Sequence, residues 1–210
     1  MRRDIEFRTE DGVVLRGWHY VQERAGRTPT VVMAHGYSAV KEMYLDRFAE
    51  AFAEGGIGAV VFDNRNFGAS DGEPRQEIDP WQQIRDYRDA ITWASGLPEV
   101  DAERIGIWGS SYSGAHVLVV GAIDRRVKCI IAQVPLISGH ANARRLIRAD
   151  FIAQVQAACL EDPQGTLSRQ AAGHDTSGFR KPDGARRAAN HRLVAVVHRN
   201  RSHSCASLAQ

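Results

Sequence analysis

The fold is decided by residues 104–114, which read Arg104-Ile105-Gly106-Ile107-Trp108-Gly109-Ser110-Ser111-Tyr112-Ser113-Gly114. The apolar run 104–108 is typical of a buried strand, and a helical pattern begins near Tyr112 and continues to residue 121. Small residues stand two positions before and after Ser111, at Gly109 and Ser113, so a sharp turn closes there without clashes. We predict a strand–turn–helix unit that presents the Ser111 hydroxyl above a sheet as a nucleophile.

The segments around this unit alternate between strand and helix patterns. We expect strands at 5–9, 13–20, 30–34, 58–62, 104–108 and 127–132, helices at 43–54, 80–95, 112–121 and 142–160, and a last strand-like run at 193–197. Alternating apolar strands and amphipathic helices predict an α/β fold with a mostly parallel sheet and helices on both faces. Ligands of such sheets bind beyond the carboxyl ends of the strands.

The helix at 80–95 carries clear start signals. Asp79 is suited to cap it, and Gln82 to close a capping box. Trp81, Ile84 and Ile91 fall on one face, which we expect to be the inner one. Four aromatic residues are assigned to the core: Trp18, Tyr44, Trp81 and Trp108.

A second chemical motif, His35-Gly36-Tyr37, follows the strand at 30–34. An oxyanion hole needs one backbone N–H from the residue after the nucleophile and one from the loop after this strand. Tyr112 and Tyr37 are the candidate donors. We expect His35, which precedes Gly36 at the strand end, to support the loop rather than act as a base.

Two other polar residues have competing interpretations. Asp63, directly after the strand at 58–62, is either a catalytic acid or the organiser of a tight loop, and its Asn- and Gly-rich surroundings favour the loop. His116 lies among valines and a leucine one turn into the helix after Ser111, which indicates a packed, hydrogen-bonded histidine rather than a base.

These motifs resemble the α/β-hydrolase superfamily over residues 1 to about 160. One segment resembles a narrower group, the dienelactone-hydrolase-like and serine-aminopeptidase-like hydrolases and the related polyketide acyltransferases. This segment reads Asp63-Asn64-Arg65-Asn66-Phe67-Gly68-Ala69-Ser70-Asp71-Gly72-Glu73-Pro74-Arg75. The resemblance implies acyl transfer through Ser111, with the oxyanion held by the N–H groups of Tyr37 and Tyr112 and no metal or organic cofactor. The supporting residues are then His35, Gly36, Gly109, Ser113 and Gly114. The helix at 142–160 is either a lid or plain scaffold.

The pattern breaks in the last quarter of the chain. The superfamily places its acid and histidine after two further strands, each followed by a helix, and each such step takes about 30 residues. Only 46 residues follow position 164, so the motif has no matching position for either group and the fold is expected to be incomplete. His198, directly after the last strand-like run, is the least unsuitable candidate for the base.

Composition also separates this tail from the rest. Residues 165–210 contain seven Arg and one Lys against two Asp, a net charge of +6 that leaves −4 for residues 1–164. We therefore expect a hydrolase core at 1–164 and a basic, poorly ordered tail at 165–210. An altered reading frame in a G+C-rich gene would produce such a change, and translating the coding DNA in all three frames tests it. No basic block with interleaved aromatics indicates a nucleic-acid site.

The remaining composition limits the class of protein. Three scattered cysteines, Cys129, Cys159 and Cys205, do not suit a disulfide framework or a zinc site. No signal-peptide pattern or apolar run of membrane-spanning length is visible, so a cytoplasmic protein is expected. The sequence predicts a serine hydrolase for an ester, thioester or related acyl bond of a small molecule. An acyltransferase of the same fold stays open, as does a catalytically impaired remnant or binding protein that lacks the acid and the histidine. The oligomeric state also stays open.

Overall fold

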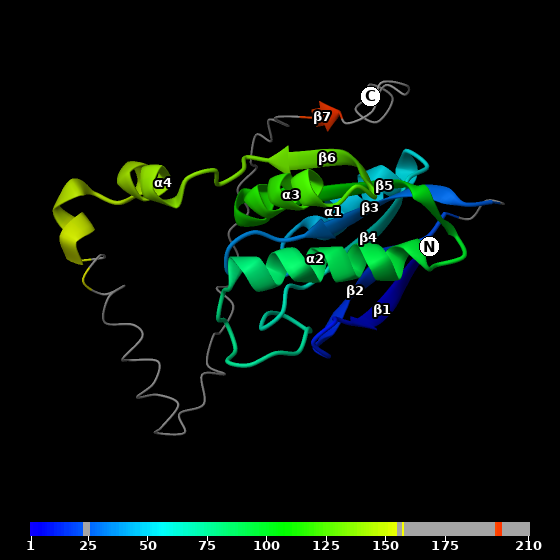
Figure 1. Cartoon of the computed structure of the whole chain (residues 1–210), viewed down its shortest axis with the longest axis horizontal. Helices are drawn as coiled ribbons and strands as arrows, with labels where there is room; N and C mark the ends of the chain where they lie inside the picture. Colours follow the sequence, from blue (N-terminus) through cyan, green and yellow to red (C-terminus); the bar gives the residue numbers. More distant parts are fainter. Residues whose placement is uncertain (23–25, 155–156, 158–195, 199–210) are drawn as a thin grey trace. The chain divides into compact units, whose positions relative to one another are not determined.

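The computed structural model describes residues 1–22, 26–154, 157 and 196–198. Within them, seven strands form one sheet in the order β1-β2-β4-β3-β5-β6-β7 (Figure 1). The strands are β1 (Arg2–Arg8), β2 (Val14–Tyr20), β3 (Thr28–Ala34), β4 (Gly58–Phe62), β5 (Val100–Ser110), β6 (Val127–Gln133) and β7 (Val196–His198). The helices are α1 (Leu45–Glu54), α2 (Pro80–Ser95), α3 (Ser111–Ile123) and α4 (Gly139–Leu146), with a 3-10 turn, η1, at Ala149–Phe151.

The sheet is mostly parallel, as predicted. Strands β4, β3, β5 and β6 run parallel, whereas β1, β2 and β7 pair antiparallel with their neighbours. The register aligns Ala34 with Phe62 on one side and with Gly109 on the other, and Gly109 with Ala132. Because parallel strands end at one edge, the loops after β3, β4, β5 and β6 all meet there.

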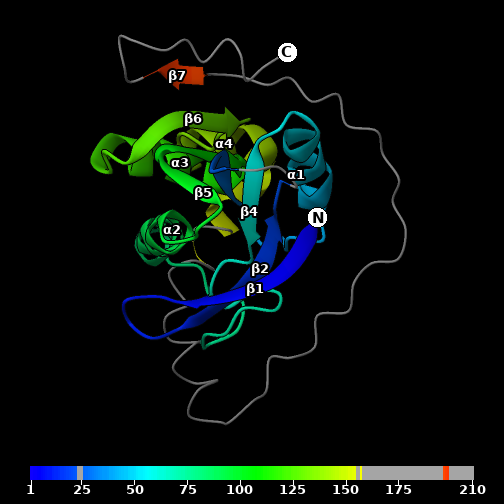
Figure 2. The ribbon, with the colours of Figure 1, turned by 90° about the vertical axis from the view of Figure 1, so that its right-hand side faces the viewer.

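Helices cover both faces of this sheet. Figure 2 shows α1 on one side of the strands and α2 with α3 on the other. Alternate residues of β3 supply the two cores: Val32 packs in the cluster that contains Ile84 of α2, and Met33 in the cluster that contains Leu45 of α1. Since side chains alternate along a strand, a continuous apolar run such as Val31–Ala34 fills both interiors.

Two aromatic residues assigned to the core are exposed instead. Trp81 stands in the first turn of α2 and is 66% exposed, although Ile84 and Ile91 of the same helix are buried. The first turn lies at the end of the helix, where only part of the predicted inner face is covered. Tyr44 precedes α1 with a left-handed backbone (φ 70°) and is also exposed. Trp108 is buried and Trp18 half-buried.

The start of α2 confirms one capping prediction and changes another. The Asp79 carboxylate accepts hydrogen bonds from the N–H groups of Trp81 and Gln82, at 2.8 and 3.1 Å. The Gln82 side chain accepts instead from the Arg65 guanidinium, at 3.0 Å. A buried guanidinium offers a charged donor, which makes a stronger hydrogen bond than an exposed backbone N–H.

The chain divides after Pro135 into a second compact unit that begins at Leu136. The single helix predicted at 142–160 is interrupted: α4 ends at Leu146, Ile147 is extended (ψ 129°), and helical backbone resumes in η1 and at residues 152–154 and 157. None of the residues of α4 is buried, so this helix lacks the tertiary packing that stabilises most helices in proteins. The proposed domain boundary at 164 lies outside the described residues.

Candidate active site

Ser111 occupies a strained turn between β5 and α3. Its backbone is left-handed, with φ 51°, whereas Ser110 before it is extended, with φ −108° and ψ 148°. A Cβ at Gly109 would overlap the carbonyl oxygen of Ser113, so only glycine fits two positions before Ser111. Non-glycine residues adopt such a backbone at a cost of about 1–3 kcal/mol, and functional sites are where this strain collects. The turn expected from the sequence is present at the carboxyl edge.

Two further glycines bring other segments against this turn. A Cβ built on Gly36 would lie 3.2 Å from the Ser111 Cβ and 3.0 Å from the Ser110 carbonyl oxygen. A Cβ built on Gly114 would lie 3.0 Å from the Pro135 Cα, in the segment after β6. The loop after β3 therefore contacts the Ser111 turn directly, because neither position leaves room for a larger residue.

The loop after β3 carries the Tyr37 amide, one residue beyond the Gly36 that packs against Ser111. The tight turn at residues 36–39 closes with the Ala39 N–H, which donates to the Gly36 carbonyl at 3.4 Å, so its own hydrogen bond does not use the Tyr37 N–H. The Tyr37 and Tyr112 rings meet edge to face at 5.7 Å. Ser110 makes no side-chain cap on α3, and the unpaired N–H groups of a helix start favour a negative charge.

His35 is buried and occupied with local hydrogen bonds. Its Nε2 accepts from the Asn64 N–H at 3.0 Å, and its Nδ1 donates to the Gly36 carbonyl at 3.0 Å. The Ser113 hydroxyl donates to the His35 carbonyl. Burial lowers the pKa of the imidazole, so it stays neutral. His35 thus joins the loops after β3 and β4 to the start of α3.

Asp63 organises the same loops from the end of β4. It is fully buried, and its carboxylate accepts from the Lys41 N–H at 2.7 Å, the Lys41 ammonium at 2.6 Å and the Ala69 N–H at 2.9 Å. A Cβ at Gly68 would overlap this carboxylate. The structure favours the loop role over that of a catalytic acid, because both carboxylate oxygens are already bonded within the loops.

His116 differs in part from the expectation. It is packed, being 2% exposed, with its ring against Tyr112 at 4.6 Å. Neither ring nitrogen has a hydrogen-bond partner among the described residues, so the expected hydrogen bond is wrong. The neighbours of His116 on α3 are mostly apolar, so they bury its ring and offer its nitrogens no hydrogen-bond partner. Burial lowers its pKa to about 4.

His198 lies in β7, which pairs antiparallel with β6. Its backbone stands opposite Cys129, whereas Ser110 stands opposite Gln133 on the other side of β6. The four residue steps from one row to the other span roughly 13 Å along the strand. This register sets the His198 backbone away from the edge at which Ser111 lies.

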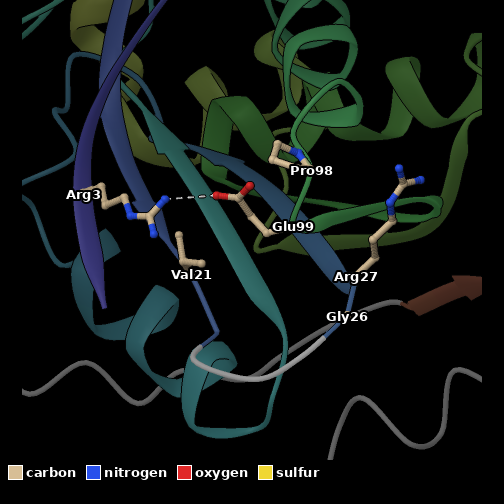
Figure 3. Close-up of a pocket in the computed structure, with 6 residues that line it drawn as sticks. All are labelled: Arg3, Val21, Gly26, Arg27, Pro98 and Glu99. Carbon is tan, nitrogen blue, oxygen red and sulfur yellow. Dashed lines mark hydrogen bonds and ion pairs between the residues drawn. The ribbon is translucent and has the colours of Figure 1, made fainter.

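Two hollows lie away from Ser111. One, of about 380 Å³, lies before the starts of β3 and β5, at the opposite edge of the sheet, where Arg3 reaches Glu99 at 3.2 Å (Figure 3). The other, of about 460 Å³, lies beside Trp18 and Lys41 and is lined mostly by β1 and β2. Neither is lined by Ser111 or its neighbours in the turn, so neither is the candidate acyl pocket.

Two buried basic residues, Lys41 and Arg65, were not predicted from the sequence. Lys41 pairs with Asp63, and Arg65 binds Asp86 of α2 at 2.6 and 2.8 Å and Asp11 at 2.8 and 3.0 Å. Each lies in a loop that follows a buried strand, β3 for Lys41 and β4 for Arg65, but their partners lie 21 to 54 positions away in the sequence. Spacing along the chain does not reveal such pairs.

The described part of the chain contains no cluster of three metal-ligating His, Cys, Asp or Glu side chains. In that same part, no helix is long and apolar enough to cross a bilayer.

The parallel sheet, the left-handed serine between strand and helix, and the glycine-tight loop beside it define the α/β-hydrolase class. Comparison with known families agrees, since the model of the X-Pro dipeptidyl-peptidase (S15) family matches residues 11–204. The chain belongs to this family, within the α/β-hydrolase superfamily.

Individual relatives extend this comparison. The chain is 40% identical over 173 residues to thiohydrolase aneE of Aspergillus aculeatus, covering 82% of this chain and 52% of that protein. It is 40% identical over 144 residues to polyketide transferase grgF of a Penicillium species, covering 69% and 48%. The crystal structure of the α/β-hydrolase GrgF from Penicillium sp. sh18 superposes with a TM-score of 0.71 at 34% identity, over 83% of this chain and 56% of that one. The chain thus spans about half the length of the curated relatives it matches.

Proposed function

We propose that the protein is a serine enzyme that cleaves an ester, thioester or related acyl bond of a small molecule through an acyl-enzyme on Ser111. One observation carries this proposal: Ser111 has a left-handed backbone at the start of α3, and the loop after β3 packs directly against it. A turn of this kind allows a nucleophile and two backbone donors to face one carbonyl group, which supports the proposal.

The reaction would proceed in two steps. The Ser111 Oγ attacks the acyl carbon, and the oxyanion that forms accepts hydrogen bonds from the N–H groups of Tyr37 and Tyr112. Collapse expels the alcohol or thiol, which takes up the proton that Ser111 has lost, and leaves an acyl-serine ester. Water then attacks this ester, releasing the carboxylic acid and restoring the hydroxyl.

The proton acceptor for Ser111 is not one of the buried histidines described. Both nitrogens of His35 are hydrogen-bonded, and burial lowers the pKa values of His35 and His116. His19 lies in β2 opposite Val60, the central residue of β4, and its Nδ1 is 3.8 Å from the carboxylate of Glu99, which precedes β5 at the opposite edge of the sheet. His198 stays a prediction, with the unfavourable register given above.

The surroundings of Ser111 favour an apolar acyl group. Several large apolar side chains are exposed on loops and helix starts at the carboxyl edge: Tyr37, Met43, Tyr44, Trp81 and Val134. A contiguous patch of such side chains would form an apolar binding surface. The names of the relatives, thiohydrolase and polyketide transferase, support a thioester or polyketide-like acyl substrate.

An acyltransferase is the nearest alternative, since the same acyl-serine passes to an acceptor other than water. A binding protein without turnover is the alternative outside enzymes. We further propose a cytoplasmic location, no nucleic-acid or membrane partner, and the division into residues 1–164 and 165–210.

A fluorophosphonate probe tests the proposal. The purified chain should gain the probe mass on the peptide that contains Ser111, and Ser111→Ala should abolish labelling. Ser110→Ala is the matched control, because it removes the neighbouring hydroxyl and should still label. A chain that stays unlabelled supports the binding protein, and labelling that disappears only in Ser110→Ala would contradict the choice of Ser111. Adding an amine or alcohol acceptor with a p-nitrophenyl ester then separates transfer from hydrolysis.

A further inference from the structure

The loop that carries the Tyr37 amide is tethered at both ends. At its start, the His35 ring accepts from the Asn64 N–H and the His35 carbonyl accepts from the Ser113 hydroxyl. At its end, the Lys41 N–H donates to the Asp63 carboxylate at 2.7 Å. The residues between these tethers include Ser38, whose backbone is left-handed (φ 52°). A strained loop of this kind keeps one conformation only where its surroundings enforce it.

The second tether is a buried ion pair. Lys41 is 4% exposed, and its ammonium donates to Asp63 at 2.6 Å and pairs with Glu42 at 2.9 Å. The opposite oxygen of Asp63 accepts the Lys41 backbone N–H, so one carboxylate holds the residue by both its main chain and its side chain. The Ala69 N–H completes the cluster from the loop after β4.

A purely structural role would not require this chemistry. Replacing a buried ion pair by apolar residues is often neutral or stabilising, so the pair is weak evidence for stability. The pair constrains the geometry of the loop, because two charge-assisted hydrogen bonds fix the position of residue 41 relative to β4. Residue 41 is four positions beyond Tyr37, whose amide has to stand within hydrogen-bond distance of the developing oxyanion.

We propose that Lys41 and Asp63 form a positioning pair that holds the Tyr37 amide in place for the oxyanion. The inference rests on the proposed acyl transfer at Ser111. Neither side chain contacts the substrate: the pair acts through the loop at 36–40. Lys41 therefore contributes to the rate of the chemical step and not to binding of the ground-state ester.

Steady-state hydrolysis of p-nitrophenyl butyrate by the whole chain tests this role. Lys41→Met should lower kcat by about 30- to 100-fold, since a misplacement of about 1 Å costs up to about 10²-fold, while KM changes little. Lys41→Arg, which keeps the charge and donors, should recover most of kcat. Arg47→Met is the matched control: it removes an exposed cation that pairs with Glu50 on α1, and its kcat should equal that of the unchanged chain.

A second variant removes the risk that one unpaired buried charge simply unfolds the protein. Lys41→Met/Asp63→Asn deletes both charges, should fold, and should keep the low kcat. Hydrogen exchange of the peptide covering residues 35–41 should be faster in both Met variants than in Arg47→Met. Wild-type kcat in a folded double variant, or an equal loss through KM, would overturn the proposal.

The two hypotheses fail in different ways. If the unchanged chain neither hydrolyses the ester nor takes up the fluorophosphonate, the proposed function is wrong. Hydrogen exchange alone then shows whether Lys41 and Asp63 hold the loop at 36–40 in place. If the chain is active but the Met variants exchange residues 35–41 at the control rate, the positioning pair is wrong and Ser111 keeps its role.

Discussion

Replacing His116 by phenylalanine is expected to remove an acid-induced loss of stability. The imidazole is 2% exposed, lies against the Tyr112 ring at 4.6 Å, and has no hydrogen-bond partner for either nitrogen among the described residues. A proton on this ring would create an unpaired charge in an apolar site, which burial disfavours. The pKa of His116 is accordingly lowered from 6.5 to about 4.

The direction of the pH effect follows from the two pKa values. The unfolded chain takes up the proton near pH 6.5, whereas the folded chain resists it until about pH 4. Stability is therefore fully present above pH 6.5 and falls as the pH drops from there to about 4. The pKa difference corresponds to a loss of about 3 kcal/mol in the free energy of unfolding, which is reached when the unfolded chain is fully protonated.

Urea denaturation followed by circular dichroism, at steps between pH 7.5 and 4.5, measures this effect. The stability of His116→Phe minus that of the unchanged protein should grow in favour of the variant as the pH falls. His35 and His19, whose pKa values burial also lowers, contribute equally to both proteins and cancel. His140→Asn, at an exposed position on α4, is the control and should follow the unchanged protein. A difference that is constant with pH would refute the argument.

Two other changes have expected outcomes. Gly109→Ala should leave little folded protein in thermal denaturation, because the new Cβ overlaps the Ser113 carbonyl. The control Gly106→Ala should stay folded, because its Cβ would lie 3.4 Å from its nearest neighbour. Similar melting temperatures for the two variants would contradict this argument. Arg65→Met should cost about 3–5 kcal/mol in urea denaturation, since it leaves the buried carboxylate of Asp86 without its partner. Adding Asp86→Asn should restore part of that loss, and no restoration would show that the charge is not the cause.

Local patterns predicted most of the sheet and its helices. The apolar run ending at Ala34 and the periodic helix after Asp79 depend on neighbours within a few residues, and the structure places both close to their expected bounds. The exposed Trp81 and the early end of α4 were not foreseen, because helical periodicity marks a face but does not show whether anything packs against it.

The sequence by itself determined the turn at Ser111. Small residues at positions 109 and 113 permit the left-handed backbone at Ser111, which larger residues there would forbid. The residues that meet this requirement lie within five consecutive positions. Only the tertiary structure decided the ion pairs of Lys41 and Arg65 and the uncharged, hydrogen-bonded state of the His35 ring. It also decided that the His116 ring has no hydrogen-bond partner among the described residues. The physical reason is that burial and hydrogen-bond partners come from strands and loops distant in the chain, whose register and packing no local pattern specifies.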